Sequence, residues 1–154
     1  VMANQTVMTD IRLGAAVLNY DQWDGYAPDR DRILTDVVNQ GVKNFVVLTG
    51  DIHLAGIGQL TTEAAPTTAI GTEFVTTSIS SSGSGSAATE SLLIALPNII
   101  DAEVMYRGYT LHTLTANDWT AEYRIVENNL VEDSSTSVWK TFKLMAGSPA
   151  ITEA

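Results

Sequence analysis

The amino-acid sequence predicts a single α+β domain, and three features lead to that prediction. A helix with one apolar stripe, near the N-terminus, is followed by a short, continuously apolar strand, which is the succession found in α/β units. The last third of the chain alternates strand-like runs with turn residues, as antiparallel sheets do. Of the 154 residues 45% are hydrophobic and 17% are charged, which supplies enough apolar material for one core.

The first third of the chain is expected to form a strand, a loop, a helix and a buried strand. Residues 1–8 alternate loosely, as a strand would, and a loop follows from Asp10 to Tyr26. Pro28 suits the first turn of a helix, and Gly41 suits the left-handed conformation that ends one. Phe45–Leu48 is an unbroken apolar run, as expected of a strand that is buried on both faces.

The middle of the chain is expected to contain two strands, a loop and a helix. Residues 53–60 have the composition of a strand, and residues 72–80 are a Thr-rich run with apolar positions, typical of another. Residues 80–86 are all Ser or Gly, which predicts an exposed, mobile loop. A helix is predicted from Ala87 to Leu96, where Pro97 would end it.

The last third is expected to form three antiparallel strands. The first two, residues 108–114 and 119–126, flank a turn at residues 116–118. A polar loop over residues 127–136 leads to the third strand, residues 137–144.

The charge and composition exclude several classes of function. The net charge is −10, and residues 1–77 and 78–154 each hold nine acidic and four basic side chains. With no basic stripe, long-range attraction to nucleic acid is not expected, and a small phosphorylated substrate would need a bound cation. The absence of cysteine excludes disulfides and thiolate ligands. The apolar runs fall far short of the roughly 20 residues of a membrane span.

The clearest chemical motif is Leu48–His53, directly after the buried strand. In extended chain, side chains two positions apart point the same way, so Asp51 and His53 are expected to face one ion. Ligands of open α/β sheets gather beyond the carboxyl ends of strands, where this pair lies. A carboxylate beside an imidazole suits iron, zinc or manganese better than calcium alone. The same short pattern also occurs as a capping aspartate with a structural histidine, and both interpretations remain open at this point.

A second dense segment, residues 19–26, precedes the first helix. It holds two carboxylates together with several aromatic and amide side chains. One interpretation makes this loop a substrate wall beside the metal site, because loops on a rigid scaffold carry most binding residues. The other makes residues 23–26 a turn whose aromatic side chains attach it to the core.

Three blocks of the sequence, in their order and spacing, resemble PhoD-like phosphatases. The blocks are Asn19–Arg30, Val46–His53 and Thr72–Ser81. The resemblance extends over residues 1–126, and more weakly to residues 146–149. It implies the C-terminal part of a metallophosphoesterase-type two-sheet sandwich with flanking helices. The whole chain would then be a partial catalytic domain whose N-terminal half is absent.

The same resemblance implies an activity and a location. Members of this family hydrolyse phosphate mono- and diesters at alkaline pH with iron and calcium, and zinc or manganese would also suit the ligands. They are typically exported, so an extracellular or periplasmic location is expected. The cations would neutralise the phosphate and activate a water molecule for in-line attack.

The resemblance also implies roles for individual residues. Asp51 and His53 would be catalytic and metal-binding. The substrate would be bound by Asn19, Trp23, Asp24 and Tyr26. Neighbours of the site with open roles would be Asn4, Gln5 and Glu73. Since a divalent site needs about four to eight donors, the isolated chain is expected to lack activity without its N-terminal half.

One departure from the family and two rival functions remain. After the histidine the family often has serine and tryptophan, whereas this chain has Leu54-Ala55-Gly56, so substrate contacts there are not carried over. A non-catalytic module that binds a partner or polymer through its β surface is the first rival. A nucleotide-specific phosphodiesterase of related fold is the second.

Other conspicuous residues are expected to be structural. His112 is predicted to be a half-exposed strand residue and Arg107 a surface arginine, although Arg107 also has the reach to contact a phosphate. The large aromatic residues of the last third are expected to pack the second sheet: Trp119, Tyr123 and Trp139. The pair Glu132-Asp133 has no spaced run of oxygen donors around it and is predicted to lie in a solvated loop.

Overall fold

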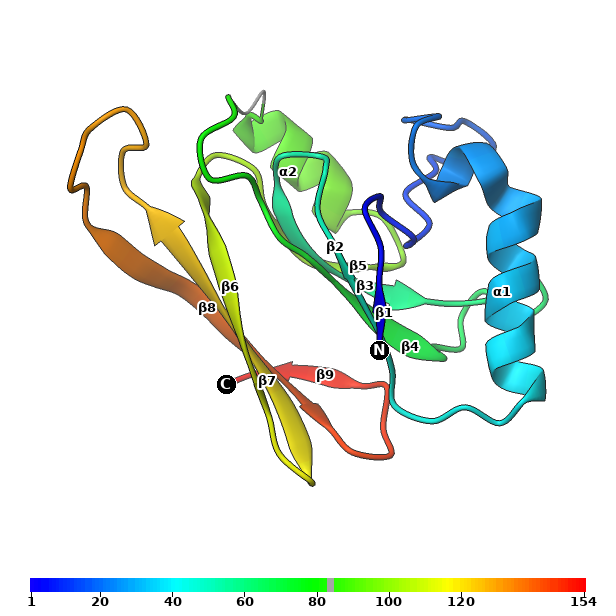
Figure 1. The fold of residues 1–154 in the computed structure, drawn as a ribbon. Helices are drawn as coiled ribbons and strands as arrows, with labels where there is room; N and C mark the ends of the chain where they lie inside the picture. Colours follow the sequence, from blue (N-terminus) through cyan, green and yellow to red (C-terminus); the bar gives the residue numbers. More distant parts are fainter. Residues whose placement is uncertain (83–84) are drawn as a thin grey trace.

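Two β-sheets packed face to face organise the protein, in a computed structural model that describes residues 1–82 and 85–154 (Figure 1). The first sheet has the strand order β1-β2-β4-β3-β5 and the second the order β6-β7-β8-β9. Helix α1 covers the outer face of the first sheet, and α2 lies beside β5. The arrangement confirms the predicted α+β class.

The first sheet is mixed, and its parallel part places three strand ends on one edge. Its strands are β1 (Met2–Ala3), β2 (Phe45–Thr49), β3 (Ala55–Leu60), β4 (Gly71–Val75) and β5 (Ile99–Glu103). β1, β2 and β4 run parallel, whereas β3 is antiparallel to β4 and β5. The carboxyl ends of β1, β2 and β4 therefore meet along the upper edge of the sheet in Figure 1.

The helices form where local sequence favours them, and each packs through an apolar side. The helical elements are η1 (Trp23–Tyr26), α1 (Ala27–Asn39) and α2 (Ala87–Ile94). Pro28 lies in the first turn of α1, and Gly41 follows the helix with a φ of 63°. Leu34 of α1 is buried in one cluster with Val47 of β2. Within the described residues, no helix is long and apolar enough to cross a membrane.

The second sheet is antiparallel, and its inner face supplies half of the main core. Its strands are β6 (Arg107–Leu114), β7 (Asp118–Val126), β8 (Thr136–Met145) and β9 (Ile151–Glu153). Trp119 and Tyr123 are buried in the cluster between the sheets, and the partly buried Trp139 packs against it, as predicted. The Tyr123 hydroxyl also donates a hydrogen bond of 2.9 Å across the layers to the Gly56 carbonyl.

One glycine of β3 lets the N-terminal segment lie directly on the first sheet. A Cβ atom at Gly58 would come within 2.2 Å of the Thr9 hydroxyl oxygen. The neighbouring Met8 is fully buried in the cluster beneath α1. The close approach of residues 7–9 to the sheet therefore requires glycine at position 58.

Several predicted boundaries are wrong, and pairing partners explain why. The strand predicted over residues 1–8 has only two residues, because the chain after Ala3 turns away to make loop contacts. The strand predicted over residues 72–80 ends at Val75, where its pairing with β2 ends. β5 and β9 were not predicted, since both are short edge strands, and the partner of β5 lies about 40 residues earlier in the sequence. Part of the predicted loop 80–86, residues 83–84, lies outside the described residues.

Candidate functional site

The loop that carries Asp51 and His53 lies at the carboxyl end of β2, but its chain is not extended. The φ angles of Asp51 and His53 are 71° and 56°, and the Ile52 amide donates to the Gly50 carbonyl at 2.9 Å. The expected extended geometry is therefore wrong, and the strand predicted over residues 53–60 begins only at Ala55. Left-handed backbone is uncommon for residues other than glycine and persists where surrounding contacts hold it.

Asp51 is exposed, and a buried glutamine orients its carboxylate. Gln22 Nε2 donates to Asp51 Oδ2 at 2.7 Å, and Gln22 Oε1 accepts from the Val7 amide at 2.6 Å. Only 1% of Gln22 is exposed to solvent. Sequence reasoning missed Gln22 as a site residue, and its position in the dense segment 19–26 was the only signal for it.

His53 is also exposed, and its ring contacts a carbonyl oxygen of a distant segment. Its Nδ1 lies 3.2 Å from the Ser82 carbonyl oxygen. A carbonyl oxygen only accepts, so this contact places a proton on Nδ1, and in the neutral ring Nε2 then has the lone pair. A histidine held in this way presents Nε2 as a possible metal ligand.

Arg107 lies beneath this loop, and the prediction that it is a surface arginine is wrong. It is 3% exposed, and its guanidinium donates to the His53 carbonyl at 2.5 Å and the Val104 carbonyl at 3.1 Å. A third, longer bond of 3.3 Å reaches the Ser78 hydroxyl. The side chain is buried because it begins β6 where these loop acceptors converge.

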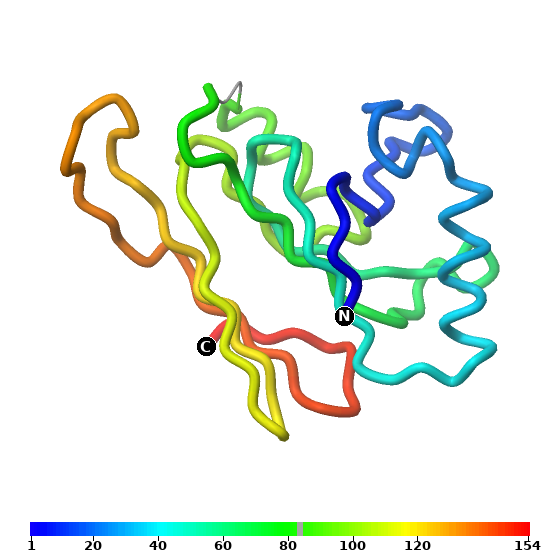
Figure 2. The backbone as a smooth tube through the Cα atoms, in the orientation of Figure 1, coloured from blue at the N-terminus to red at the C-terminus, as the bar shows by residue number. Residues whose placement is uncertain are grey.

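The end of β1 lies beside the same loop. The Gly50 amide donates to the Gln5 carbonyl at 3.2 Å, and the Asn4 amide donates to the Leu48 carbonyl at 3.0 Å. Figures 1 and 2 show this segment, the loop after β2 and the segment before α2 along one edge of the sheet. A hollow of about 550 Å³ opens beside Asn4 and Gln5, and Trp23 and Tyr26 also line it, whereas Asp51 and His53 do not.

Asn19 and Asp24 do not line this hollow, although both come from the same segment. Asn19 Oδ1 accepts from the Asp21 amide at 2.9 Å and so stabilises the turn before η1. Asp24 is buried, pairs with the Arg30 guanidinium and accepts from the Ile11 amide at 3.1 Å. Burial raises the pKa of Asp24, and the charge of Arg30 opposes this rise without cancelling it.

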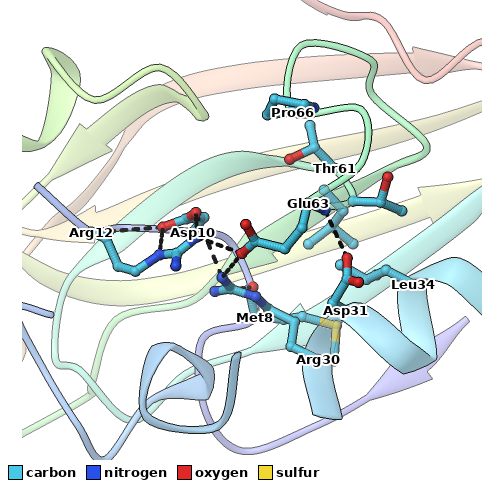
Figure 3. Close-up of a pocket in the computed structure, with 11 residues that line it drawn as sticks. Met8, Asp10, Arg12, Arg30, Asp31, Leu34, Thr61, Glu63 and Pro66 are labelled. Atoms are coloured by element: carbon cyan, nitrogen blue, oxygen red, sulfur yellow. Dashed lines mark hydrogen bonds and ion pairs between the residues drawn. The ribbon is translucent and has the colours of Figure 1, made fainter. Parts of the chain in front are cut away.

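Arg30, the partner of Asp24, belongs to a network of charges around a cavity of about 70 Å³ (Figure 3). Arg12 bridges Asp10 at 2.5 Å and Glu63 at 2.6 Å. Burial would raise the pKa of Asp10, but the hydrogen bonds and charges of Arg12 and Arg30 outweigh it and lower the pKa. The network fastens the N-terminal loop, α1 and the loop after β3 to one another.

Glu73 is a buried anchor in the middle of β4. Its carboxylate accepts from the amides of Met8 and Thr9 at 2.8 and 2.7 Å and from the Thr49 hydroxyl at 2.9 Å. Burial raises the pKa of Glu73, although these hydrogen bonds oppose the rise. Glu73 therefore supports the site from inside the protein, by holding the N-terminal segment against β2 and β4.

The second histidine has a structural environment, as predicted. His112 is half-buried on β6, and its Nδ1 accepts a hydrogen bond of 2.9 Å from the Trp119 indole. Its ring also packs against Phe74, and burial lowers its pKa. Glu132 and Asp133 lie in an exposed loop.

The described residues contain no cluster of three or more His, Cys, Asp or Glu side chains that is suited to a metal ion. Asp51 and His53 are thus a pair of candidate ligands with an oxygen and an imidazole nitrogen. The pair has the donor chemistry of a transition-metal site but too few donors for a complete one.

Comparison with known proteins identifies the family and agrees with the fold. The family model "PhoD-like phosphatase" matches residues 1–123. Alkaline phosphatase D of Bacillus subtilis (strain 168) is 34% identical over 134 residues, a match that covers 82% of this chain and 23% of that protein. A solved structure of PhoD superposes with a TM-score of 0.86 at 30% identity, over 98% of this chain and 30% of that one.

The chain thus spans about a quarter of the curated relative that it matches. The family model nevertheless covers most of the present sequence. The chain therefore belongs to the PhoD-like phosphatase family.

Proposed function

We propose that this chain is the part of a metal-dependent phosphoesterase that contributes Asp51 and His53 to the active site. The enzyme would hydrolyse phosphate mono- and diesters. The observation that carries the proposal is the His53 ring, whose Nδ1 faces a carbonyl oxygen and whose Nε2 is left available, in the same loop as the exposed Asp51 carboxylate. The pair lies at the carboxyl edge of a parallel strand, where α/β sheets place their ligands.

The two side chains fit a cation of the expected kind. Asp51 offers hard oxygen and His53 a neutral imidazole, a combination that suits iron, zinc or manganese, with calcium held by additional oxygen ligands. When bound, such cations neutralise phosphate charge and activate water. Trp23 and Tyr26, which line the hollow next to Asn4 and Gln5, would contact the organic part of the substrate.

A complete site needs donors from outside this chain. Divalent sites use about four to eight ligands, and this chain offers two. The relatives are several times longer than this chain. We assign the missing ligands to an N-terminal half of the same metallophosphoesterase-type catalytic domain. Such an enzyme would act outside the cytoplasm, in the extracellular space or the periplasm, as the family resemblance implies.

The test compares matched histidine variants in a chain extended by the proposed N-terminal half. His53→Gln is expected to lower kcat/KM for p-nitrophenyl phosphate by roughly 100-fold or more, because it removes a ligand of the activating cation. His112→Gln is the control and is expected to stay within about threefold of the parent, since His112 contacts the core. Equal effects of the two variants would overturn the role of His53 as a ligand. Turnover by the 154-residue chain alone would overturn the need for ligands from outside it.

A further inference from the structure

The loop of Asp51 and His53 holds two residues in left-handed backbone, and contacts from elsewhere must stabilise it. Such a conformation is uncommon for residues other than glycine and persists only where the surrounding structure holds it. The hydrogen bond within the loop, from Ile52 to Gly50, does not reach either side chain. Two buried polar side chains do reach the loop, one on each side: Gln22 and Arg107.

The orientation of Gln22 follows from its partners. The Val7 amide can only donate, so Oε1 must face Val7, and Nε2 is then directed at Asp51. A second bond, from the Trp23 amide to the Val7 carbonyl at 3.1 Å, fixes the backbone beside Gln22. Neither a carboxylate nor an apolar side chain at position 22 would accept from Val7 and donate to Asp51 together.

The neutrality of Gln22 also matters for a carboxylate that is to bind a cation. An arginine or lysine here would orient Asp51 equally well but would neutralise its charge. An amide donor holds one carboxylate oxygen and leaves the negative charge in place. Gln22 therefore positions Asp51 without competing with a cation.

Arg107 holds the other half of the loop. Its guanidinium binds the His53 carbonyl and also the Ser78 hydroxyl, which in turn donates to the Ser81 carbonyl at 3.1 Å. The next residue, Ser82, accepts from the His53 ring. One buried cation thus fixes both the backbone of His53 and the segment that orients its imidazole.

We infer that Gln22 and Arg107 are positioning residues, which together preorganise Asp51 and His53. The metal-binding role of that pair rests on the proposed function, whereas the clamp on the loop does not. The measurement is amide hydrogen exchange by NMR on the 154-residue chain. Gln22→Met and Arg107→Met are expected to accelerate exchange of the Ile52 amide, which donates the hydrogen bond within the loop, by about tenfold or more.

The control is Asp10→Asn, which perturbs the neighbouring charge network without touching the loop. It is expected to change exchange of the Ile52 amide by no more than about twofold. Unchanged loop exchange in both Met variants, or an equal increase in Asp10→Asn, would overturn the inference.

A variant on the exposed side covers the case in which Gln22→Met does not fold. Asp51→Gly removes the acceptor and tolerates the left-handed backbone. The side-chain amide protons of Gln22 are then expected to exchange about tenfold faster or more, and unchanged exchange would contradict the clamp.

A titration with Mn²⁺ separates this inference from the proposed function. In the wild type, Mn²⁺ is expected to broaden the His53 signals, and Gln22→Met is expected to weaken that binding about tenfold or more. Accelerated loop exchange without any Mn²⁺ effect in the wild type would support the clamp and count against the metal site. Mn²⁺ binding of equal strength in Gln22→Met would count against positioning by Gln22.

Discussion

Asp24 and Asp51 are two aspartates from segments that both looked functional, and their surroundings are opposite. The Asp24 side chain is 0% exposed and is paired with the guanidinium of Arg30. Asp51 is exposed, and its carboxylate is held by the neutral amide of Gln22. A guanidinium neutralises a carboxylate, whereas an amide only orients it. The charge of the partner therefore distinguishes an acid that stabilises the fold from one that remains available to a cation.

The largest expected effect is on stability, at Asp24. Asp24→Ala leaves the 5%-exposed Arg30 side chain buried without its main partner, and is expected to lower the free energy of unfolding by about 3–5 kcal/mol. Urea denaturation measures this change. A loss below about 1 kcal/mol would mean that Asp24 is not the structural member of the comparison.

Asp10, in the same network, tests the electrostatics through pH. Its folded-state pKa is lowered, so the ionised form contributes stability above the unfolded value of 3.8, and that contribution is lost as pH falls through the folded pKa. Asp10→Asn is expected to lower the free energy of unfolding by about 1 kcal/mol at pH 7. The difference in the free energy of unfolding between Asp10→Asn and the wild type should shrink below pH 3.8. Urea denaturation at pH 7 and below pH 3.8 measures it. A deficit that is independent of pH would exclude the charge of Asp10 as its cause.

At Asp51 the expected change in stability is small. Asp51→Gly loses the hydrogen bond from Gln22 but relieves left-handed backbone strain, so the free energy of unfolding is expected to change by no more than about 1 kcal/mol. The matched variant Asp51→Ala keeps the strain and should be the less stable of the two in thermal denaturation. The opposite order would show that the backbone at this position is not strained.

The smallest effect is expected at Glu63, the exposed edge of the charge network. Its side chain is 52% exposed, so solvent screens its bond to Arg12. Glu63→Gln is expected to lower the free energy of unfolding by less than about 0.5 kcal/mol in urea denaturation. A larger loss would mean that solvent does not screen the bond between Glu63 and Arg12, so that Glu63 acts as part of the buried network.

The sequence was informative where structure is local. The helix after Pro28, the apolar strand after Asn44 and the hairpins of the second sheet follow from periodicity, capping and turn residues within each segment. The edge strands β5 and β9 were missed, because a short strand is specified by its partner more than by its own residues.

The site was predictable in part, for the same reason. Asp51 and His53 are adjacent in one motif, but the left-handed turn between them depends on contacts with distant segments. Gln22 and Arg107 are separated from the loop by 29 and 54 residues, so no local pattern connects them to it. The role of Asp24, in substrate binding or in the fold, was left open, because its pairing with Arg30 depends on how the loop packs on the first turn of α1.

The bare backbone of Gly58 gives a distant position influence over the candidate site. Thr9 occupies the space that a side chain at position 58 would fill, and the same short segment includes Val7, the residue that holds Gln22. Even the methyl group of an alanine at position 58 would push residues 7–9 away from the sheet and turn the side-chain amide of Gln22 away from Asp51. Loss of ligand geometry without any change near the ligands is therefore the expected signature of substitution at position 58.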